Sequence, residues 1–395
     1  SVLNKFRNKR EEVLSGAKAG ADAAVMLVKG QLVTAVSCSS VEYETLLDAK
    51  ITMTRAVNSV AAEGGSPFAV LVSMIVPPET EESRIKSIME VLEETASSLN
   101  VQIAGGHSEV SDKVNMPVFS VTAYGNCAGE LLDSRREKDT LYGQDIVMTG
   151  YMALESTGVA AVQHREELSF APGYLAGAAD YLQELSVVKH AQIALEHGSA
   201  VMHDLSETGV FGGLWELGEK MQAGMEIEAR NIPVHQETIE LSEQLEQNPY
   251  TMQSAGSLLV VTRDGNGLVH RYEKEGIHAA LIGKVMPGHD KVLLNRDERR
   301  FIEQPRGMKK VKGKMVELTE LRKLILGVIE KNSRIDVHEL AILLGVSEVE
   351  VANELAEMEK EKVICGYHTL INWDNTSDER VNAMIEVQVT PQRGE

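Results

Sequence analysis

The chain has 395 residues, enough for two to four domains that each bury a core of their own. Its 39 basic and 59 acidic residues give a net charge of −20, so the surface as a whole repels nucleic acid and any contact with DNA must be local. Cys38, Cys127 and Cys365 are too few and too far apart for a disulfide framework or a zinc motif, and no apolar run approaches the ~20 residues of a membrane span, so we expect a cytoplasmic protein outside the membrane.

Residues 1–135 alternate short apolar runs with longer amphipathic stretches, which predicts an α/β domain. The predicted strands lie at 24–28, 32–36, 70–76 and 118–124, and the predicted helices at 48–63 and 80–99.

A further short strand is predicted from residue 101, and it runs into the pair Gly105-Gly106. Two adjacent glycines favour a turn and let the backbone approach a ligand closely. We therefore predict a turn that presents His107, Ser108 and Glu109 to a ligand.

Residues 140–305 repeat the same alternation and predict a second α/β domain. Strands are expected at 145–149, 257–262 and 279–285, and helices near 173–185, 188–197 and 213–222.

The most informative segment of this second domain is 203–209, where His203, Asp204 and Glu207 precede a helix that opens at Gly209. The first N–H groups of a helix and the positive end of its dipole favour an anion, and a nearby carboxylate can hold the Mg²⁺ that accompanies a phosphate. The alternative is an Asp or Ser that caps an amphipathic helix engaged only in packing.

Several motifs of the first 305 residues occur in the order and spacing of one enzyme superfamily. Segments 105–109 and 202–209, with 20–25, 56–67 and 254–261, resemble the signatures of the aminoimidazole ribonucleotide synthetase superfamily, most of all its hydrogenase-maturation (HypE-like) branch. The resemblance implies a homodimer of the N-terminal domains, with ATP and Mg²⁺ near the interface and Asp22 and Asp204 as metal ligands. The predicted nucleotide-contacting residues are Gly105, Gly106, Ser108, Glu109, Asn58, Asp204, Glu207 and Gly209.

The chain also departs from the pattern of this superfamily. Ser59 and the serine-rich stretch 37–40 stand where the resemblance leads us to expect carboxylates, and Mg²⁺ prefers anionic oxygen ligands. The magnesium site is therefore expected to be degenerate. His107 and His203 are candidate acid and base groups, with a structural hydrogen-bonding role as the alternative for each.

A basic linker is predicted at 306–316. It has five cations and no acidic residue up to position 314, which fits a solvent-exposed linker. The more specific alternative is a basic arm that binds along the DNA backbone. The five cations are Arg306, Lys309, Lys310, Lys312 and Lys314.

Residues 317–374 resemble the winged helix-turn-helix of the leucine-responsive (Lrp/AsnC-like) regulators, with helices expected at 318–329, 336–344 and 347–360 and a wing at 363–371. Residues 375–395 resemble only the start of the effector domain of those regulators. From 315 to 395 there are 8 basic and 16 acidic residues, and the third helix is rich in glutamate. DNA binding is therefore possible but not favoured, because recognition helices gain affinity from Arg and Lys.

The sequence as a whole predicts a two-domain α/β protein with a small winged-helix appendage. We expect it to bind ATP or another phosphorylated small molecule, and to act as an ATP-dependent synthetase or dehydratase if it is an enzyme. The alternative is a ligand-sensing transcriptional regulator that uses the winged helix.

Overall fold

The computed structural model describes residues 10–15, 23–29, 31–40, 43, 45–127, 138–166, 168–296, 298–304, 319–329 and 335–360. The chain divides into a larger unit, residues 1–310, and a smaller one, residues 311–395. The expected basic linker, the wing at 363–371, the segment 375–395, Asp22 and Cys365 lie outside the described residues.

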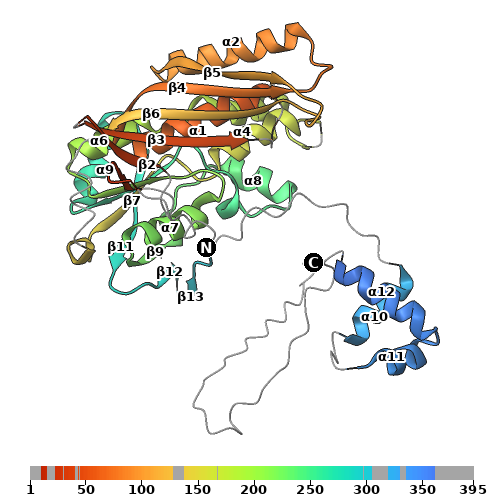
Figure 1. Ribbon diagram of the computed structural model, residues 1–395. Helices are drawn as coiled ribbons and strands as arrows, with labels where there is room; N and C mark the ends of the chain where they lie inside the picture. Colours follow the sequence, from red (N-terminus) through yellow and green to blue (C-terminus); the bar gives the residue numbers. More distant parts are fainter. Residues whose placement is uncertain are drawn as a thin grey trace. The chain divides into compact units, whose positions relative to one another are not determined.

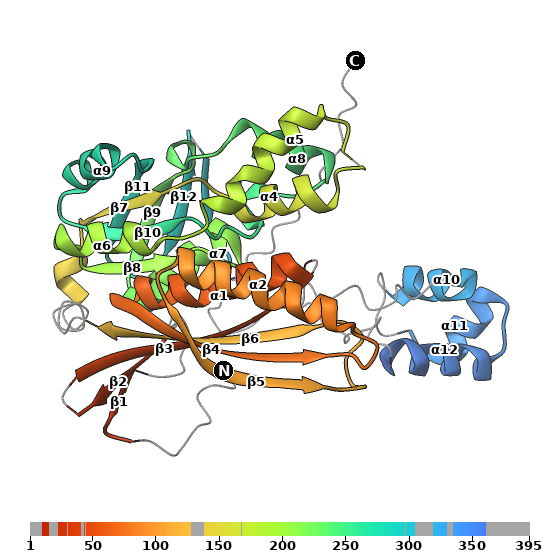
Figure 2. The same ribbon diagram turned by 90° about the horizontal axis from the view of Figure 1, so that it is seen from above.

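A six-stranded sheet forms the first part of the larger unit, in the strand order β1-β2-β3-β6-β4-β5. Only the β4–β5 pair is parallel. Helices α1 and α2 lie on one face of this sheet, as Figure 2 shows, and pack on its apolar side chains. The elements are β1 (Val13–Ser15), β2 (Ala24–Val28), β3 (Gln31–Ser40), α1 (Thr45–Ala62), β4 (Gly65–Val76), α2 (Glu82–Ser98), β5 (Gln102–Val110) and β6 (Val118–Cys127).

The prediction of a Gly-Gly turn at 105–106 is wrong. β5 continues through both glycines, which lie beside a break in the β4–β5 register between Val70 and Leu71. A Cβ at Gly106 would come within 1.7 Å of the Val72 carbonyl oxygen, and the backbone φ is +153°. The glycine therefore permits close approach of two strands rather than a turn.

A seven-stranded sheet in the order β13-β12-β9-β11-β7-β10-β8 forms the second part. α7 packs on one face of it, and α6 and α9 pack on the other together with the end of α1 (Figure 1). The strands are β7 (Asp145–Thr149), β8 (Val201–Asp204), β9 (Gly224–Glu228), β10 (Leu258–Thr262), β11 (Ala279–Met286), β12 (Lys291–Asn295) and β13 (Glu298–Phe301). The helices are α4 (Leu154–Gln163), α5 (Pro172–Ala179), α6 (Val188–Glu196), α7 (Gly209–Met221), α8 (Gln236–Gln244) and α9 (Gly265–Lys274), with short 3₁₀ turns at Lys138–Leu141, Asp180–Gln183, Ala229–Asn231 and Pro249–Thr251.

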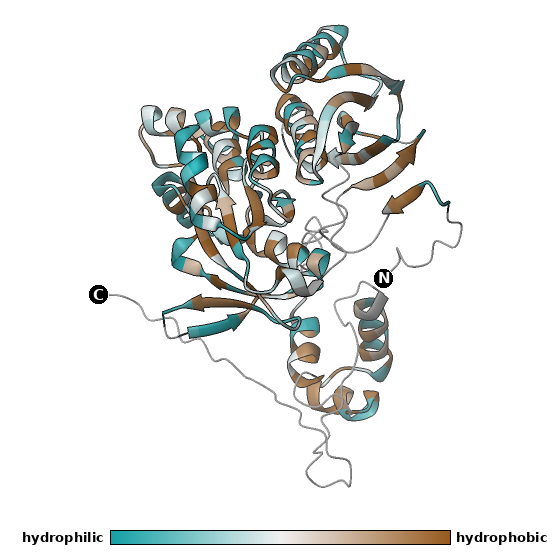
Figure 3. Cartoon of the chain, turned by 90° about the vertical axis from the view of Figure 1, so that its left-hand side faces the viewer, coloured by the Kyte–Doolittle hydropathy of each residue, from teal (hydrophilic) through white to brown (hydrophobic). Residues whose placement is uncertain are grey.

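Helix α1 belongs to both cores of the larger unit. Every residue from Ile51 to Ala62 is buried, because Ala56, Val57 and Val60 face the first sheet while Ala61 and Ala62 join the core of the second. Figure 3 shows many strand residues of both sheets coloured as hydrophobic, as expected for sheets that pack against helices. Polar residues on the buried surface of α1 therefore need partners in the second domain.

The smaller unit contains α10 (Glu320–Ile329), α11 (Val337–Leu344) and α12 (Glu348–Lys360). Ile325, Leu340, Val351 and Met358 are among the residues of its core. α11 and α12 begin and end within one residue of their expected positions, whereas the expected start of the first helix at 318 lies outside the described residues. The Glu339 N–H donates to the Asp336 carboxylate (2.8 Å), the Glu350 N–H donates to the Ser347 hydroxyl (3.3 Å), and Gly345 ends α11 at φ +69°.

None of the described helices is both long enough and apolar enough to cross a bilayer.

Candidate functional site

A row of polar side chains on α1 faces the second domain. Arg55, Ser59 and, just past the helix end, Glu63 follow one another at four-residue spacing, and Asn58 lies three residues after Arg55, so the four share one side of the helix. All four are buried. Their partners on the second domain define a charged junction between the two domains.

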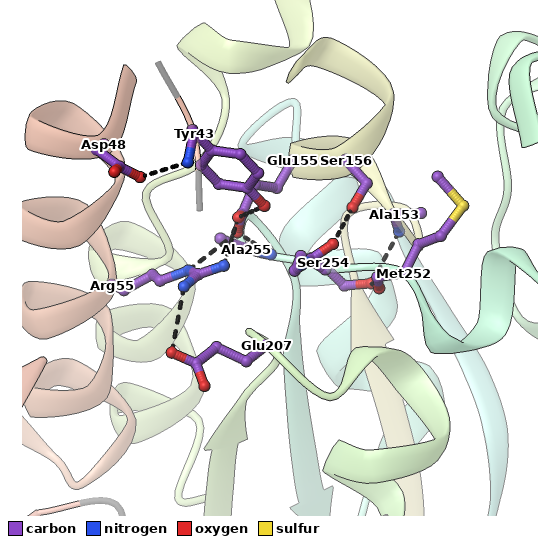
Figure 4. Close-up of polar contacts among 11 residues, drawn as sticks. Tyr43, Asp48, Arg55, Ala153, Glu155, Ser156, Glu207, Met252, Ser254 and Ala255 are labelled. Carbon is purple, nitrogen blue, oxygen red and sulfur yellow. Dashed lines mark hydrogen bonds and ion pairs between the residues drawn. The ribbon is translucent and has the colours of Figure 1, made fainter. Parts of the chain in front are cut away.

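At the centre of this junction is a buried ion pair. Arg55 donates from Nη2 to Glu155 Oε1 (2.5 Å) and from Nε to Glu155 Oε2 (3.2 Å), and the two side chains are 3% and 0% exposed. Glu155, on α4, also accepts from the Tyr43 hydroxyl (2.7 Å) and the Ala255 N–H (3.3 Å). Figure 4 shows these groups converging on one carboxylate.

A second carboxylate approaches Arg55 from the loop before α7. Glu207 Oε1 lies 3.3 Å from Arg55 Nη1, and its side chain is 41% exposed (Figure 4). Burial alone would lower the pKa of Arg55, but the negative charges of Glu155 and Glu207 and the hydrogen bonds to Glu155 raise it above its ordinary value. The junction therefore holds a permanent cation.

The other polar residues of α1 also bind the second domain. The Asn58 amide donates to the Leu185 carbonyl (2.7 Å) and accepts from the Val187 N–H (2.9 Å), so it binds the backbone of residues 185–187 to α1. The Ser59 hydroxyl donates to Asp204 Oδ2 (3.0 Å). Glu63 pairs with Lys220 of α7 at 2.6 Å, both side chains being nearly fully buried.

His203 and Asp204 are adjacent on β8 and therefore point to opposite faces of the sheet. Asp204 faces α1 and Ser59, whereas His203 is 1% exposed under α7, with Nε2 3.1 Å from Glu216. Gly209 opens α7 as expected, at φ +65°, and any Cβ there would collide with the backbone of 250–252. The N-cap residue of α7 is Thr208, which forms no side-chain capping bond.

The two segments predicted to form the ligand site, 105–109 and 203–209, do not come together within one chain. β5 is an edge strand that pairs with β4 and packs against α2, whereas 203–209 lies on the other side of α1 (Figure 2). Gly105, Gly106, Ser108 and Glu109 are exposed on β5, and His107 Nε2 lies 3.6 Å from Glu109 Oε2.

Two metal ligands were expected, and only one falls on the described part of the chain. Asp204 is there, whereas Asp22 is not, and no group of three or more His, Cys, Asp or Glu side chains among the described residues is arranged to hold a metal ion. Arg55 and Glu155 were missed by the sequence analysis. The signal for Arg55 was its place on the same helix face as Asn58 and Ser59.

Comparison with known proteins identifies both parts of the larger unit. Residues 20–127 match the family described as AIR synthase related protein, N-terminal domain, and residues 142–295 match its C-terminal domain. A putative hydrogenase expression/formation protein of Methanocaldococcus jannaschii is 24% identical over 266 residues, which are 65% of this chain and 76% of that protein.

A second relative matches a shorter stretch of the chain. An uncharacterized HTH-type transcriptional regulator, YugG of Bacillus subtilis, is 41% identical over 80 residues, 20% of this chain. The chain spans about half the length of that regulator, 48%.

Solved structures share the fold of the larger unit. A chain of the crystal structure of a HypE–HypF complex has a TM-score of 0.60 at 17% identity, covering 73% of this chain and 94% of that one. AaThiL complexed with AMPPCP and TMP gives 0.57 at 15%, covering 72% and 90%, and HypE in complex with ATP gives 0.55 at 15%, covering 77% and 89%. The matched ranges together make up more than half of the chain, which therefore belongs to the AIR synthase related proteins and carries both of their domains.

Proposed function

We propose that the chain binds ATP or another phosphorylated small molecule at the junction between α1 and the loop before α7. The observation that carries this proposal is the charged junction itself, where Arg55 contacts Glu207 and Ser59 of the same helix binds Asp204, near the start of a 13-residue helix. Two proteins of the same fold support it, because one was crystallised with ATP and the other with AMPPCP and TMP.

We propose weak binding of Mg²⁺ at this site. Asp22 and Asp204 would hold the ion, which would neutralise phosphate charge when bound. The hydroxyl of Ser59 donates to Asp204 at 3.0 Å, so a neutral group stands where a second carboxylate would strengthen the site. Slow turnover of the bound ligand, with His107 as an acid or base, belongs to the same proposal, whereas His203 points to the other face of β8 and contacts Glu216.

A homodimer would supply the other half of the site. The face of the first sheet opposite α1 and α2 carries exposed Leu71, and Phe68 of β4 and Val110 at the edge of β5 are also exposed. Apolar side chains on an open sheet face favour association. In this proposal a second copy brings its Gly105, Gly106, Ser108 and Glu109 to the bound nucleotide.

Calorimetric titration of the full chain with ATP and ADP, with and without Mg²⁺, tests the proposal. Asp204→Asn and Glu109→Gln should each weaken nucleotide binding, whereas the control Asp112→Asn, on an exposed position after β5, should not. Ser59→Asp should tighten Mg²⁺ binding. The assignment is wrong if both site variants bind like the parent, and hydrolysis of ATP at ordinary enzyme rates, about 1 to 1000 per second, would contradict a weak metal site.

A second candidate function, ligand-dependent transcriptional regulation, is favoured by the 41% identity to YugG over 80 residues. The acidic α12 counts against it. We propose that any DNA affinity comes from the five cations of the linker, so the slope of log affinity against log salt should not be steeper than roughly −4.5. Sequence-selective binding that survives replacement of the four linker lysines by glutamine in gel shifts would favour the regulator.

A further inference from the structure

The guanidinium of Arg55 has two unlike edges. Nε and Nη2 hold Glu155, which is 0% exposed and accepts two further hydrogen bonds, from Tyr43 and Ala255. Nη1 instead faces Glu207 at 3.3 Å. One edge is therefore committed to the protein interior, and the other meets a carboxylate that solvent reaches.

The contact with Glu207 is the one that a ligand can replace. It joins a single nitrogen to a side chain that is 41% exposed, whereas Glu155 is bound through both of its oxygens. Ion pairs with an exposed partner contribute little to stability, while paired Arg–carboxylate bonds are the strong ones. Loss of the Glu207 contact would leave the Arg55–Glu155 pair in place.

The position of Glu207 is also the position at which a phosphate would be stabilised. Its loop leads directly into α7, whose N-cap residue Thr208 forms no side-chain capping bond. A helix of 13 residues presents partial positive charge at this end. Arg55 adds a full positive charge, and planar guanidinium groups bind phosphate oxygens well.

We propose that Arg55 receives a terminal phosphate group of the ligand, and that Glu207 occupies this place until the ligand arrives. This inference rests on the proposed function, because it presupposes a phosphorylated ligand, and it adds that a fixed guanidinium supplies the positive charge at this point without a divalent ion. The ligand class is a phosphate monoester or diphosphate, such as ADP.

Titration calorimetry of the full chain with ADP in EDTA tests the proposal, with adenosine as the ligand that lacks phosphate. Glu207→Gln removes the competing charge and should tighten ADP binding about threefold, the scale of an exposed ion pair, without changing adenosine binding. Glu196→Gln, which removes a 50% exposed partner of Arg271, is the matched control and should leave ADP binding unchanged.

Arg55→Lys keeps the charge but cannot bridge Glu155 and a phosphate at once, and it should weaken ADP binding at least about tenfold. Glu207→Gln decides the question even if the Arg55 variant does not fold. Weaker or unchanged ADP binding in Glu207→Gln, or binding by the parent that requires Mg²⁺, overturns this inference and leaves the proposed function standing. A parent protein that binds neither ATP nor ADP under either condition overturns both.

Discussion

Replacing Glu155 by glutamine is expected to destabilise the larger unit severely. The side chain is 0% exposed and neutralises Arg55, which is itself 3% exposed. Removing one partner of a buried ion pair costs about 3–5 kcal/mol, because the other charge stays buried. Glu207 remains 3.3 Å from Arg55, which places the expected loss near the lower limit, about 3 kcal/mol.

Scanning calorimetry of the full chain measures this loss. In a domain of this size 1 kcal/mol corresponds to roughly 2–4 °C, so the Tm should fall by about 6–12 °C. Glu275→Gln, which breaks the exposed pair with Lys189, is the control and should change the Tm little. The combined Arg55→Met and Glu155→Met variant should recover much of the loss, because no charge is left unpaired. A Tm of Glu155→Gln equal to that of the parent would refute the reasoning.

Three further predictions concern other parts of the larger unit. Burial lowers the pKa of His190 to about 4 from 6.5, so the native state binds fewer protons than the unfolded chain between these pH values. About 3 kcal/mol of stability should therefore be lost as pH falls from 6.5 to 4. In urea unfolding, His190→Gln should flatten this pH dependence, whereas the exposed control His270→Gln should not. Gly106→Ala should lower the Tm more than Gly105→Ala, because both have φ +153° but only the first Cβ meets a backbone oxygen; equal losses would show that the clash is relieved. Leu71→Asp should shift a dimer toward monomer in light scattering, whereas Phe301→Asp on β13 should not.

Elements with a clear apolar period were predictable from the sequence. The strands at 24–28 and 145–149 have the predicted bounds in the structure, and the helix expected at 48–63 is α1. Helix α4 was missed because residues 154–161 are buried on all sides, so no polar face marks the helical period. The strand expected at 32–36 extends to Ser40 as β3, because it continues to pair with β6. This pairing joins residues far apart in the sequence, so the local pattern does not indicate it.

The candidate site was harder to predict for two physical reasons. His203 and Asp204 are neighbours in sequence, but a strand sends them to opposite faces, so one ligand cannot meet both side chains from the same side. The partner of Arg55 lies 100 residues away on the helix that the sequence did not reveal. Asn58 was expected to contact the nucleotide, and the structure shows its amide bound to the backbone at 185–187.

The glutamates of α12 contribute contacts within the smaller unit as well as negative charge. Arg322 of α10 donates to Glu354 and Glu357 of α12, and His338 of α11 contacts Glu348, so three acidic side chains of α12 have partners within their own unit. The contact with Glu348 raises the pKa of His338, which favours its charged form. A DNA backbone near these positions would have to compete for Arg322 and His338 while meeting the repulsion of the glutamates. The packing of α12 therefore adds to its charge in disfavouring DNA recognition by this helix.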